Sequence, residues 1–173
     1  MTTSHCSNNY GPSQFPEKLI PLFLINALTG RTLPIYGDGL HVRDWLHVED
    51  HCRAIGLILD RGRVGGTYNV GGGAEMSNRE VVDAICATVD AAFAADPALA
   101  RRFPDAPAAR GVSSATLRRF VTNRPGHDRR YAIDECKIRA ELGYAPEQDF
   151  GTGLAQCVAW YLAHEVWWRA LFA

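Results

Sequence analysis

The chain has 173 residues, of which 47% are hydrophobic and 21% are charged, and its formal net charge at pH 7 is −1. This composition predicts a globular protein with one core or slightly more, and the near-zero charge argues against a nucleic-acid or membrane-surface partner bound through bulk electrostatics. Five scattered cysteines, no apolar run near the roughly 20 residues that span a bilayer and no signal-peptide pattern predict a cytoplasmic protein with reduced thiols.

The first third of the chain alternates helical and extended patterns. Asn8 and Asn9 precede a Gly-Pro turn, where an asparagine side chain either caps the turn or holds a ligand. Residues 15–29 have the apolar spacing of a helix that ends at a glycine. A short strand is predicted at 33–36, and the Gly-Asp-Gly after it predicts a hairpin to a returning segment, 41–48, that carries Arg43.

A helix is predicted over 48–61, and two histidines near its start resemble a metal site. His47 and His51 are four residues apart and have acidic neighbours. A catalytic zinc needs three protein ligands, however, and the helical zinc motif has a glutamate where Val48 stands. Helix capping and the helix dipole explain the acidic residues more simply, so we expect no metal.

The rest of the chain continues the α/β pattern. Residues 96–114 are rich in alanine, proline and arginine and lack periodicity, which predicts a long mobile insertion. The other predicted elements are a strand at 66–70, a helix at 80–92 capped by Ser77, a strand at 118–122, a helix from Asp134 to Leu142 and a helix at about 150–168.

Residues 123–134 are unusually dense in charge around a Pro-Gly turn. Because proline fixes one backbone angle and glycine permits a positive one, the side chains of Arg124 and His127 can converge. Arginine offers a planar fork of donors, and histidine adds a donor that responds to pH near neutrality, so the loop suits an anion. The alternative is a surface turn with salt bridges among Asp128, Arg129 and Arg130.

Several motifs occur in an order that points to one family. They are Ser7-Asn8-Asn9-Tyr10-Gly11-Pro12, Phe15-Pro16-Glu17-Lys18-Leu19-Ile20-Pro21, Pro34-Ile35-Tyr36-Gly37-Asp38-Gly39, Arg43-Asp44-Trp45, Thr67-Tyr68-Asn69-Val70-Gly71-Gly72, Arg124-Pro125-Gly126-His127-Asp128 and Trp160-Tyr161-Leu162. Together they resemble the C-terminal half of the dTDP-glucose 4,6-dehydratase family, which belongs to the extended short-chain dehydrogenases/reductases. The resemblance covers nearly the whole chain except the 96–114 insertion.

The resemblance implies a fold, a reaction and a set of site residues. The fold is α/β, the last part of a doubly wound Rossmann-like sheet plus a small mixed α/β substrate-binding lobe. The reaction uses NAD to convert dTDP-glucose to the 4-keto-6-deoxy sugar nucleotide, and the family is homodimeric. By position, Asn9 matches a residue that contacts NAD. The positions that match the nucleotide-sugar pocket are Asn8, Lys18, Leu19, Pro34, Ile35, Tyr36, Arg43, Asn69, Asn123, Arg124 and His127.

Two departures from the family pattern limit what the resemblance carries over. Asn123 stands where the family usually has aspartate. The chain also has no Tyr-x-x-x-Lys and no Gly-x-x-Gly-x-x-Gly or Gly-x-Gly-x-x-Gly, and the family has its acidic elimination residues upstream of the matched region. We therefore expect residues 1–173 to be the nucleotide-sugar-binding portion without the NAD-binding portion, hence a truncated form. The alternatives are a stand-alone nucleotide-sugar binding module, or part of another extended reductase such as an epimerase or decarboxylase.

Overall fold

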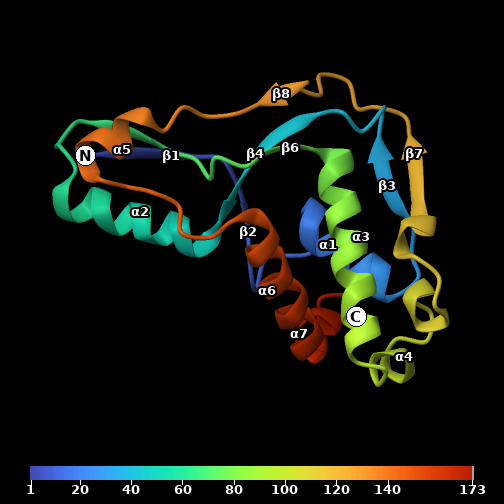
Figure 1. Cartoon of the computed structure of the whole chain (residues 1–173). Helices are drawn as coiled ribbons and strands as arrows, with labels where there is room; N and C mark the ends of the chain where they lie inside the picture. The colour runs from blue at the N-terminus through green and yellow to red at the C-terminus, as the bar shows by residue number, and fades with distance from the viewer. Residues whose placement is uncertain (173) are drawn as a thin grey trace.

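The computed structural model describes residues 1–172 and has an α/β architecture (Figure 1). The strands are β1 (Thr3–Cys6), β2 (Asn8–Tyr10), β3 (Leu33–Tyr36), β4 (Val42–His47), β5 (Thr67–Val70), β6 (Glu75–Ser77), β7 (Arg118–Val121) and β8 (Arg130–Tyr131). The helices are α1 (Leu19–Leu28), α2 (Val48–Arg61), α3 (Asn78–Ala95), α4 (Leu99–Arg102), α5 (Cys136–Leu142), α6 (Phe150–Ala163) and α7 (Glu165–Ala170), with 3₁₀ turns η1 (Pro107–Arg110) and η2 (Ser114–Leu117).

Strand pairing is mostly parallel and connects segments that are distant in sequence. β1 pairs with β5, and β3 pairs with β7. The central strand β4 pairs in parallel with β2 and β8 and antiparallel with β6. These pairings confirm the predicted α/β class, because parallel neighbours joined through helices are its defining feature.

The elements form two groups, each around its own apolar cluster. In the larger group α1, α3 and α6 pack together, and Leu24, Ile85 and Tyr161 are fully buried. In the smaller group α2 and α5 pack on β1 and β5 around Tyr68 and Ile138. Figure 1 shows the groups side by side, with β4 running between them and the N-terminus in the smaller one.

Local capping signals explain the helices predicted at 80–92 and from Asp134 to Leu142, which the structure has as Asn78–Ala95 and Cys136–Leu142. The Ser77 side chain accepts from the Glu80 N–H while the Glu80 carboxylate accepts from the Ser77 N–H, a complete capping box at the start of α3. α5 follows Asp134, whose carboxylate accepts from the Cys136 N–H, and ends at Gly143 with a φ of 69°. No helix within residues 1–172 is long and apolar enough to cross a membrane.

The predicted hairpin between 33–36 and 41–48 is wrong. The turn exists, since Gly37 and Gly39 have φ values of 60° and 74° and the Asp38 carboxylate accepts from the Leu40 N–H. The strands on either side of it diverge, however, because β3 takes β7 as its partner and β4 takes β2, β6 and β8. The glycines therefore redirect the chain from β3 into β4, which runs between the two groups of elements.

Residues 96–114, which the sequence predicts as a long mobile insertion, contain short regular elements. The segment contains α4 and η1, and it buries Leu99, Phe103 and Ala106 in the larger cluster. The Asp90 carboxylate accepts from Ser113 and Ser114 and fixes the end of the segment to α3. Periodicity could not reveal this, since single apolar residues at irregular spacing make these contacts. Its mobility stays a prediction.

The first and last predicted helices differ from the observed ones at their ends. The helix expected over 15–29 starts at Leu19, because residues before it form a turn. The helix expected over 150–168 breaks at His164 into α6 and α7. The break turns Trp168 back so that its indole N–H donates to the Tyr161 carbonyl at 2.9 Å.

Candidate functional site

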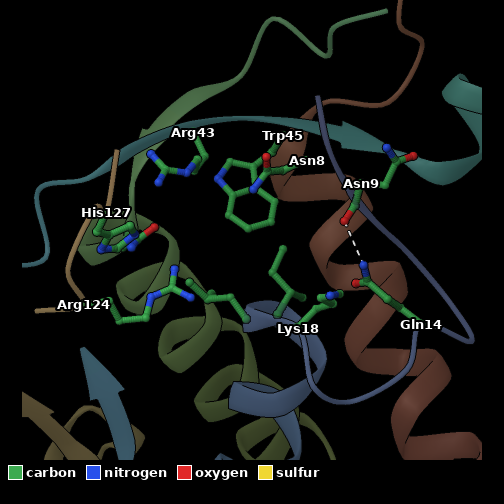
Figure 2. A pocket seen from close by; sticks show the side chains of 11 residues that line it. Asn8, Asn9, Gln14, Lys18, Arg43, Trp45, Arg124 and His127 are labelled. Atoms are coloured by element: carbon green, nitrogen blue, oxygen red, sulfur yellow. Dashed lines mark hydrogen bonds between the residues drawn. The ribbon is translucent and has the colours of Figure 1, made fainter. Parts of the chain in front are cut away.

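A cavity of about 460 Å³ lies where β2, β4 and the first turns of α1 and α3 meet the loop between β7 and β8 (Figure 2). Its lining residues come from both halves of the sequence: Asn8, Asn9, Gln14, Lys18, Leu19, Ile20, Arg43, Trp45, Asn78, Arg124 and His127. Figure 2 shows Arg43, Arg124 and His127 on one side of this space and Lys18 below it. The structure thus brings together residues that the sequence places far apart.

A second cavity of about 330 Å³ adjoins the first and shares part of its wall. The shared residues are Lys18, Leu19, Asn78, Arg124 and His127. The remaining lining residues are Glu17, Leu22, Phe23, Pro34, Ile35, Tyr36 and Val82. Because the added wall is mainly apolar, the two cavities form one cleft with a polar part and an apolar part.

The charges of the polar part have one sign. Lys18, Arg43 and Arg124 line the first cavity, and none of its lining residues is an aspartate or glutamate. Glu17 is the acidic residue of the second cavity, and its carboxylate lies 2.7 Å from the Lys18 ammonium group. The cations outnumber this one carboxylate, so the wall attracts an anion, and arginine's fork of donors suits phosphate oxygens.

The first turn of α1 adds a positive electrostatic potential to the polar part of the cleft. Among residues 1–172 no side chain caps this helix at Lys18, and Leu19 and Ile20 of its first turn line the polar part. The first backbone N–H groups of a helix have no partner within it, and the helix dipole is positive at this end. An anion in the cleft would therefore face unpaired N–H groups as well as cationic side chains.

The loop after β7 separates its arginines into two groups. Arg129 pairs with Asp38, and Arg130 pairs with Glu75, both outside the cleft. The alternative of salt bridges among Asp128, Arg129 and Arg130 is therefore wrong. Arg124 instead lies over the Tyr36 ring, 5.4 Å from its centroid, and has no carboxylate partner in the described part of the chain.

The Arg43 side chain is held in place without being neutralised. Its guanidinium donates to the Val42 carbonyl at 2.7 Å and to the Asp128 carbonyl at 2.9 Å. Carbonyl acceptors orient the guanidinium and leave its positive charge uncompensated. Arg43 on β4 and Arg124 on the distant loop thus present free charge to the same cavity.

His127 completes the polar part and has a perturbed proton affinity. Burial lowers its pKa below the ordinary value, and the neighbouring His41, Arg124 and Arg43 lower it further, while Asp128 opposes them. Neighbouring cations disfavour a second positive charge, so the imidazole carries less charge near neutral pH than an isolated histidine would. A bound anion would reverse this effect.

Most of the residues that the sequence proposed for this site line the cleft, but two do not. Asn69 lies on β5, where its side-chain amide donates to the Asp134 carbonyl. Asn123 stands behind His127 and accepts from its Nδ1 at 2.8 Å. Both lie outside the lining of the two cavities, so their contact with a ligand is not supported by this geometry.

Sequence reasoning missed Gln14, Trp45 and Asn78 in the polar part. Asn78 is the first residue of α3 and lines both cavities, so the Ser77 cap could have drawn attention to it. The missed apolar residues line the cleft from α1 and α3. They are Ile20, Leu22, Phe23 and Val82.

The residues of this chain do not fit a complete NAD site. Asn9 matches an NAD contact by resemblance, yet its amide donates to the Ser7 carbonyl at 3.0 Å and its Oδ1 lies 2.8 Å from His51 Nδ1. The chain has no glycine fingerprint to cradle a pyrophosphate. Within residues 1–172 no group of three or more histidine, cysteine or acidic side chains is placed to hold a metal ion.

Comparisons with known proteins agree with the geometry. The family model described as GDP-mannose 4,6 dehydratase matches residues 1–157. A dTDP-glucose 4,6-dehydratase from Xanthomonas campestris pv. campestris is 52% identical over 165 residues, which are 95% of this chain and 43% of the relative. One from Neisseria meningitidis serogroup B is 49% identical over 96% of this chain and 44% of the relative.

Solved structures show the same relationship. DesIV, a dTDP-glucose 4,6-dehydratase from Streptomyces venezuelae with NAD bound, superposes with a TM-score of 0.83 at 44% identity and covers 98% of this chain and 46% of that chain. A UDP-glucose 4-epimerase from Thermotoga maritima, with a TM-score of 0.76 at 23% identity, shares the fold. The chain spans less than half the length of the curated relatives it matches. It belongs to the GDP-mannose 4,6 dehydratase family, and dTDP-glucose 4,6-dehydratases are among its near relatives.

Proposed function

We propose that this chain forms the nucleotide-sugar-binding part of an NAD-dependent dTDP-glucose 4,6-dehydratase. The observation that carries the proposal is the polar part of the cleft, where Lys18, Arg43 and Arg124 line one cavity that no carboxylate lines, and where Lys18 alone pairs with Glu17 of the adjoining cavity. Such a wall suits the diphosphate of a sugar nucleotide, and the adjoining apolar part suits a flat base. Relatives that are 52% and 49% identical to this chain are named dTDP-glucose 4,6-dehydratase.

The apolar part explains why a nucleoside fits better than inorganic phosphate alone. Pro34, Ile35 and Tyr36 of β3 form one of its walls, and Leu22 and Val82 contribute others from α1 and α3. The Tyr36 ring also meets the guanidinium of Arg124, so the two parts of the cleft join at this pair. A ligand with an apolar planar end and an anionic centre would therefore contact both parts at once.

The residues of this chain bind the substrate in this proposal, and the hydride chemistry falls outside them. Tyr10 is buried, its hydroxyl lies against the Phe150 carbonyl, and burial raises its pKa well above the ordinary value, so it makes a poor base. Asp44 is occupied by the N–H groups of Gly72 and Ala74. The family's homodimer and a cytoplasmic location belong to the same proposal.

Calorimetry with dTDP-glucose tests the proposal. We expect saturable binding, which Arg43→Ala and Arg124→Ala each weaken by about 1.5–3 kcal/mol, because each removes a charge-assisted contact. Arg61→Ala on α2 is the matched control, since Arg61 is exposed and lies outside the lining of both cavities. Undiminished affinity in Arg124→Ala would remove the loop from the site.

Comparison ligands separate the alternatives. UDP-glucose binding as tightly as dTDP-glucose would favour another extended reductase, such as the epimerases that share this fold. Binding of dTDP-glucose without any product formed by a longer protein that contains this chain would favour a stand-alone binding module. We expect preference for the thymidine nucleotide.

A further inference from the structure

His41, which does not line the cleft, packs directly behind His127. It precedes β4 and is 3% exposed, and its ring stacks on the His127 ring with centroids 3.9 Å apart and planes 13° from parallel. The Tyr36 ring meets His127 edge-on from β3. The orientation of His127 is thus set by a stacked imidazole and an edge-on phenol ring.

Asn123 links the two histidines through its amide. Its Nδ2 lies 3.3 Å from His41 Nε2, and its Oδ1 lies 2.8 Å from His127 Nδ1 and 3.0 Å from the Arg124 backbone N. The contact with the Arg124 N–H requires the oxygen at this end of the amide, which fixes the orientation of the amide group. Asn123 therefore donates to His41 and accepts from His127.

These hydrogen bonds determine which ring nitrogens of His41 and His127 can carry a proton. Because the amide donates to it, His41 Nε2 acts as an acceptor, and a proton there would face the amide hydrogens of Asn123. His127 already donates from Nδ1, so it can gain a proton at Nε2 without losing a hydrogen bond. Nε2 of His127 has no protein partner among the described residues.

The charged groups around His127 determine how a bound anion would change the protonation of its imidazole. Arg43 faces it from β4, Arg124 and Asp128 from its own loop, and His41 from the segment before β4. Lys18, at the start of α1, lines the same two cavities. Positive groups outnumber the one carboxylate, so the site without ligand disfavours the imidazolium, and two phosphate charges would favour it.

We propose that His41 is a positioning residue that acts with Asn123 to fix His127, and that diphosphate binding in this cleft is coupled to uptake of a proton at His127 Nε2. The inference rests on the proposed function for the identity of the ligand. Its mechanism rests on the stacked rings of His41 and His127. No bond to the ligand is made or broken. The proton comes from solvent and returns to solvent when the ligand leaves.

The sign of the pH dependence follows from linkage. The ligand raises the pKa of His127 from its depressed value, so affinity is greatest below the ligand-free pKa. It falls by at most about tenfold per pH unit between the ligand-free and ligand-bound values, and it is constant above both. dTDP-glucose is the probe for this measurement because its diphosphate is esterified at both ends and does not titrate there.

Two variants in the ligand-free chain test the positioning role by histidine NMR titration. In His41→Ala the pKa of His127 should rise toward 6.5, because the covering ring and the neighbouring imidazole are removed. The nearly isosteric Asn123→Asp should raise it above the wild-type value by placing a carboxylate beside the imidazole. The exposed His5→Ala on β1 is the control. An unchanged His127 titration in both variants would overturn the positioning role.

Calorimetry with dTDP-glucose from about pH 5.5 to about pH 8.5 tests the coupling. The fall of dTDP-glucose affinity with rising pH that we expect for the wild type should vanish in His127→Asn. It should move to higher pH in Asn123→Asp and stay unchanged in His5→Ala. A wild-type slope that persists in His127→Asn would overturn the coupling. If the wild-type chain bound no dTDP-glucose at any pH, the proposed function and the coupling would both fail, and the NMR titration would still decide the role of His41.

Discussion

At the scale of single residues, the buried carboxylate of Asp44 organises the loop that follows β5. Its two oxygens accept from the backbone N–H groups of Gly72 at 2.9 Å and Ala74 at 2.8 Å, and the side chain is almost fully buried. Gly72 lies so close to β4 that a Cβ there would stand 1.9 Å from the Trp45 carbonyl oxygen. Asp44 thus holds the glycine loop against the strand that carries Arg43 and Trp45.

Replacing Asp44 with asparagine should cost about 1–3 kcal/mol in the free energy of unfolding. One of the two acceptors becomes an NH₂ group, which faces a backbone N–H and leaves it unsatisfied in a buried site. Urea denaturation measures the loss. Asp60→Asn on the exposed face of α2 is the control and should change stability by less than about 0.5 kcal/mol. Equal stability of the two variants would contradict this role.

At the scale of elements, the 96–114 segment closes the far end of the larger cluster. Phe103 packs near Phe93 of α3, and its ring is stacked with that of Trp168 from α7 at 6.4 Å between centroids. The Asp105 carbonyl meets Gly30 after α1, where a Cβ would be 2.4 Å away. The segment therefore joins α1, α3 and α7 at one point.

Phe103→Ala should destabilise the protein by about 3–5 kcal/mol, because it leaves a cavity among three elements. Thermal unfolding followed by circular dichroism measures the effect. Arg110→Ala, at an exposed position in η1, should leave the transition nearly unchanged. A small loss in Phe103→Ala would support the mobile insertion that the sequence predicts.

Elements whose signals are local could be predicted from the sequence, and elements fixed by distant partners could not. The start of α3 follows from Ser77 and Glu80, and the end of α5 follows from Gly143. The hairpin failed because β3 pairs with a strand some 85 residues later, which its turn residues do not encode (Leu33↔Arg118). Within the site, Arg43 and Arg124 could be predicted by residue type, while Asn78 and His41 depend on contacts that only the fold creates.

At the scale of the whole molecule, the smaller group of elements is less completely packed than the larger one. The smaller cluster is built on two strands, and Thr3, Ser4 and His5 of β1 are exposed. Leu59 and Val64, on and just after α2, are each 82% exposed. A two-stranded sheet with a free edge and an incomplete apolar cover is marginal by itself.

The smaller group should therefore open before the larger one. Amide hydrogen exchange should show lower protection for the β1–β5 ladder than for the centre of α3, where Val82 and Ile85 are fully buried. The poor solubility expected of a loosely packed chain should accompany this difference. Uniform protection across both groups, together with one sharp unfolding transition, would contradict it.

The last prediction is that a polypeptide of these 173 residues does not convert dTDP-glucose to the 4-keto-6-deoxy product. Oxidation at C4 needs a base for the hydroxyl proton and a nicotinamide held against the carbon, and loss of water needs an acid. The chain has no Tyr-x-x-x-Lys, its Asn9 is bonded within the protein, and Tyr10 and Asp44 are occupied by structural contacts. Losing one member of a cooperating catalytic set already costs several orders of magnitude.

The measurement is incubation of the purified chain with dTDP-glucose and added NAD, with the alkaline absorbance of the 4-keto sugar as the readout. A heat-treated sample is the blank, and Arg124→Ala tells whether any signal depends on the cleft. Calorimetry on the same preparation shows whether the substrate binds, so an inactive chain that binds is distinguished from an unfolded one. Product above the blank that disappears in Arg124→Ala would show that this cleft contains catalytic groups, and His127, whose pKa is lowered, would be the first residue to replace.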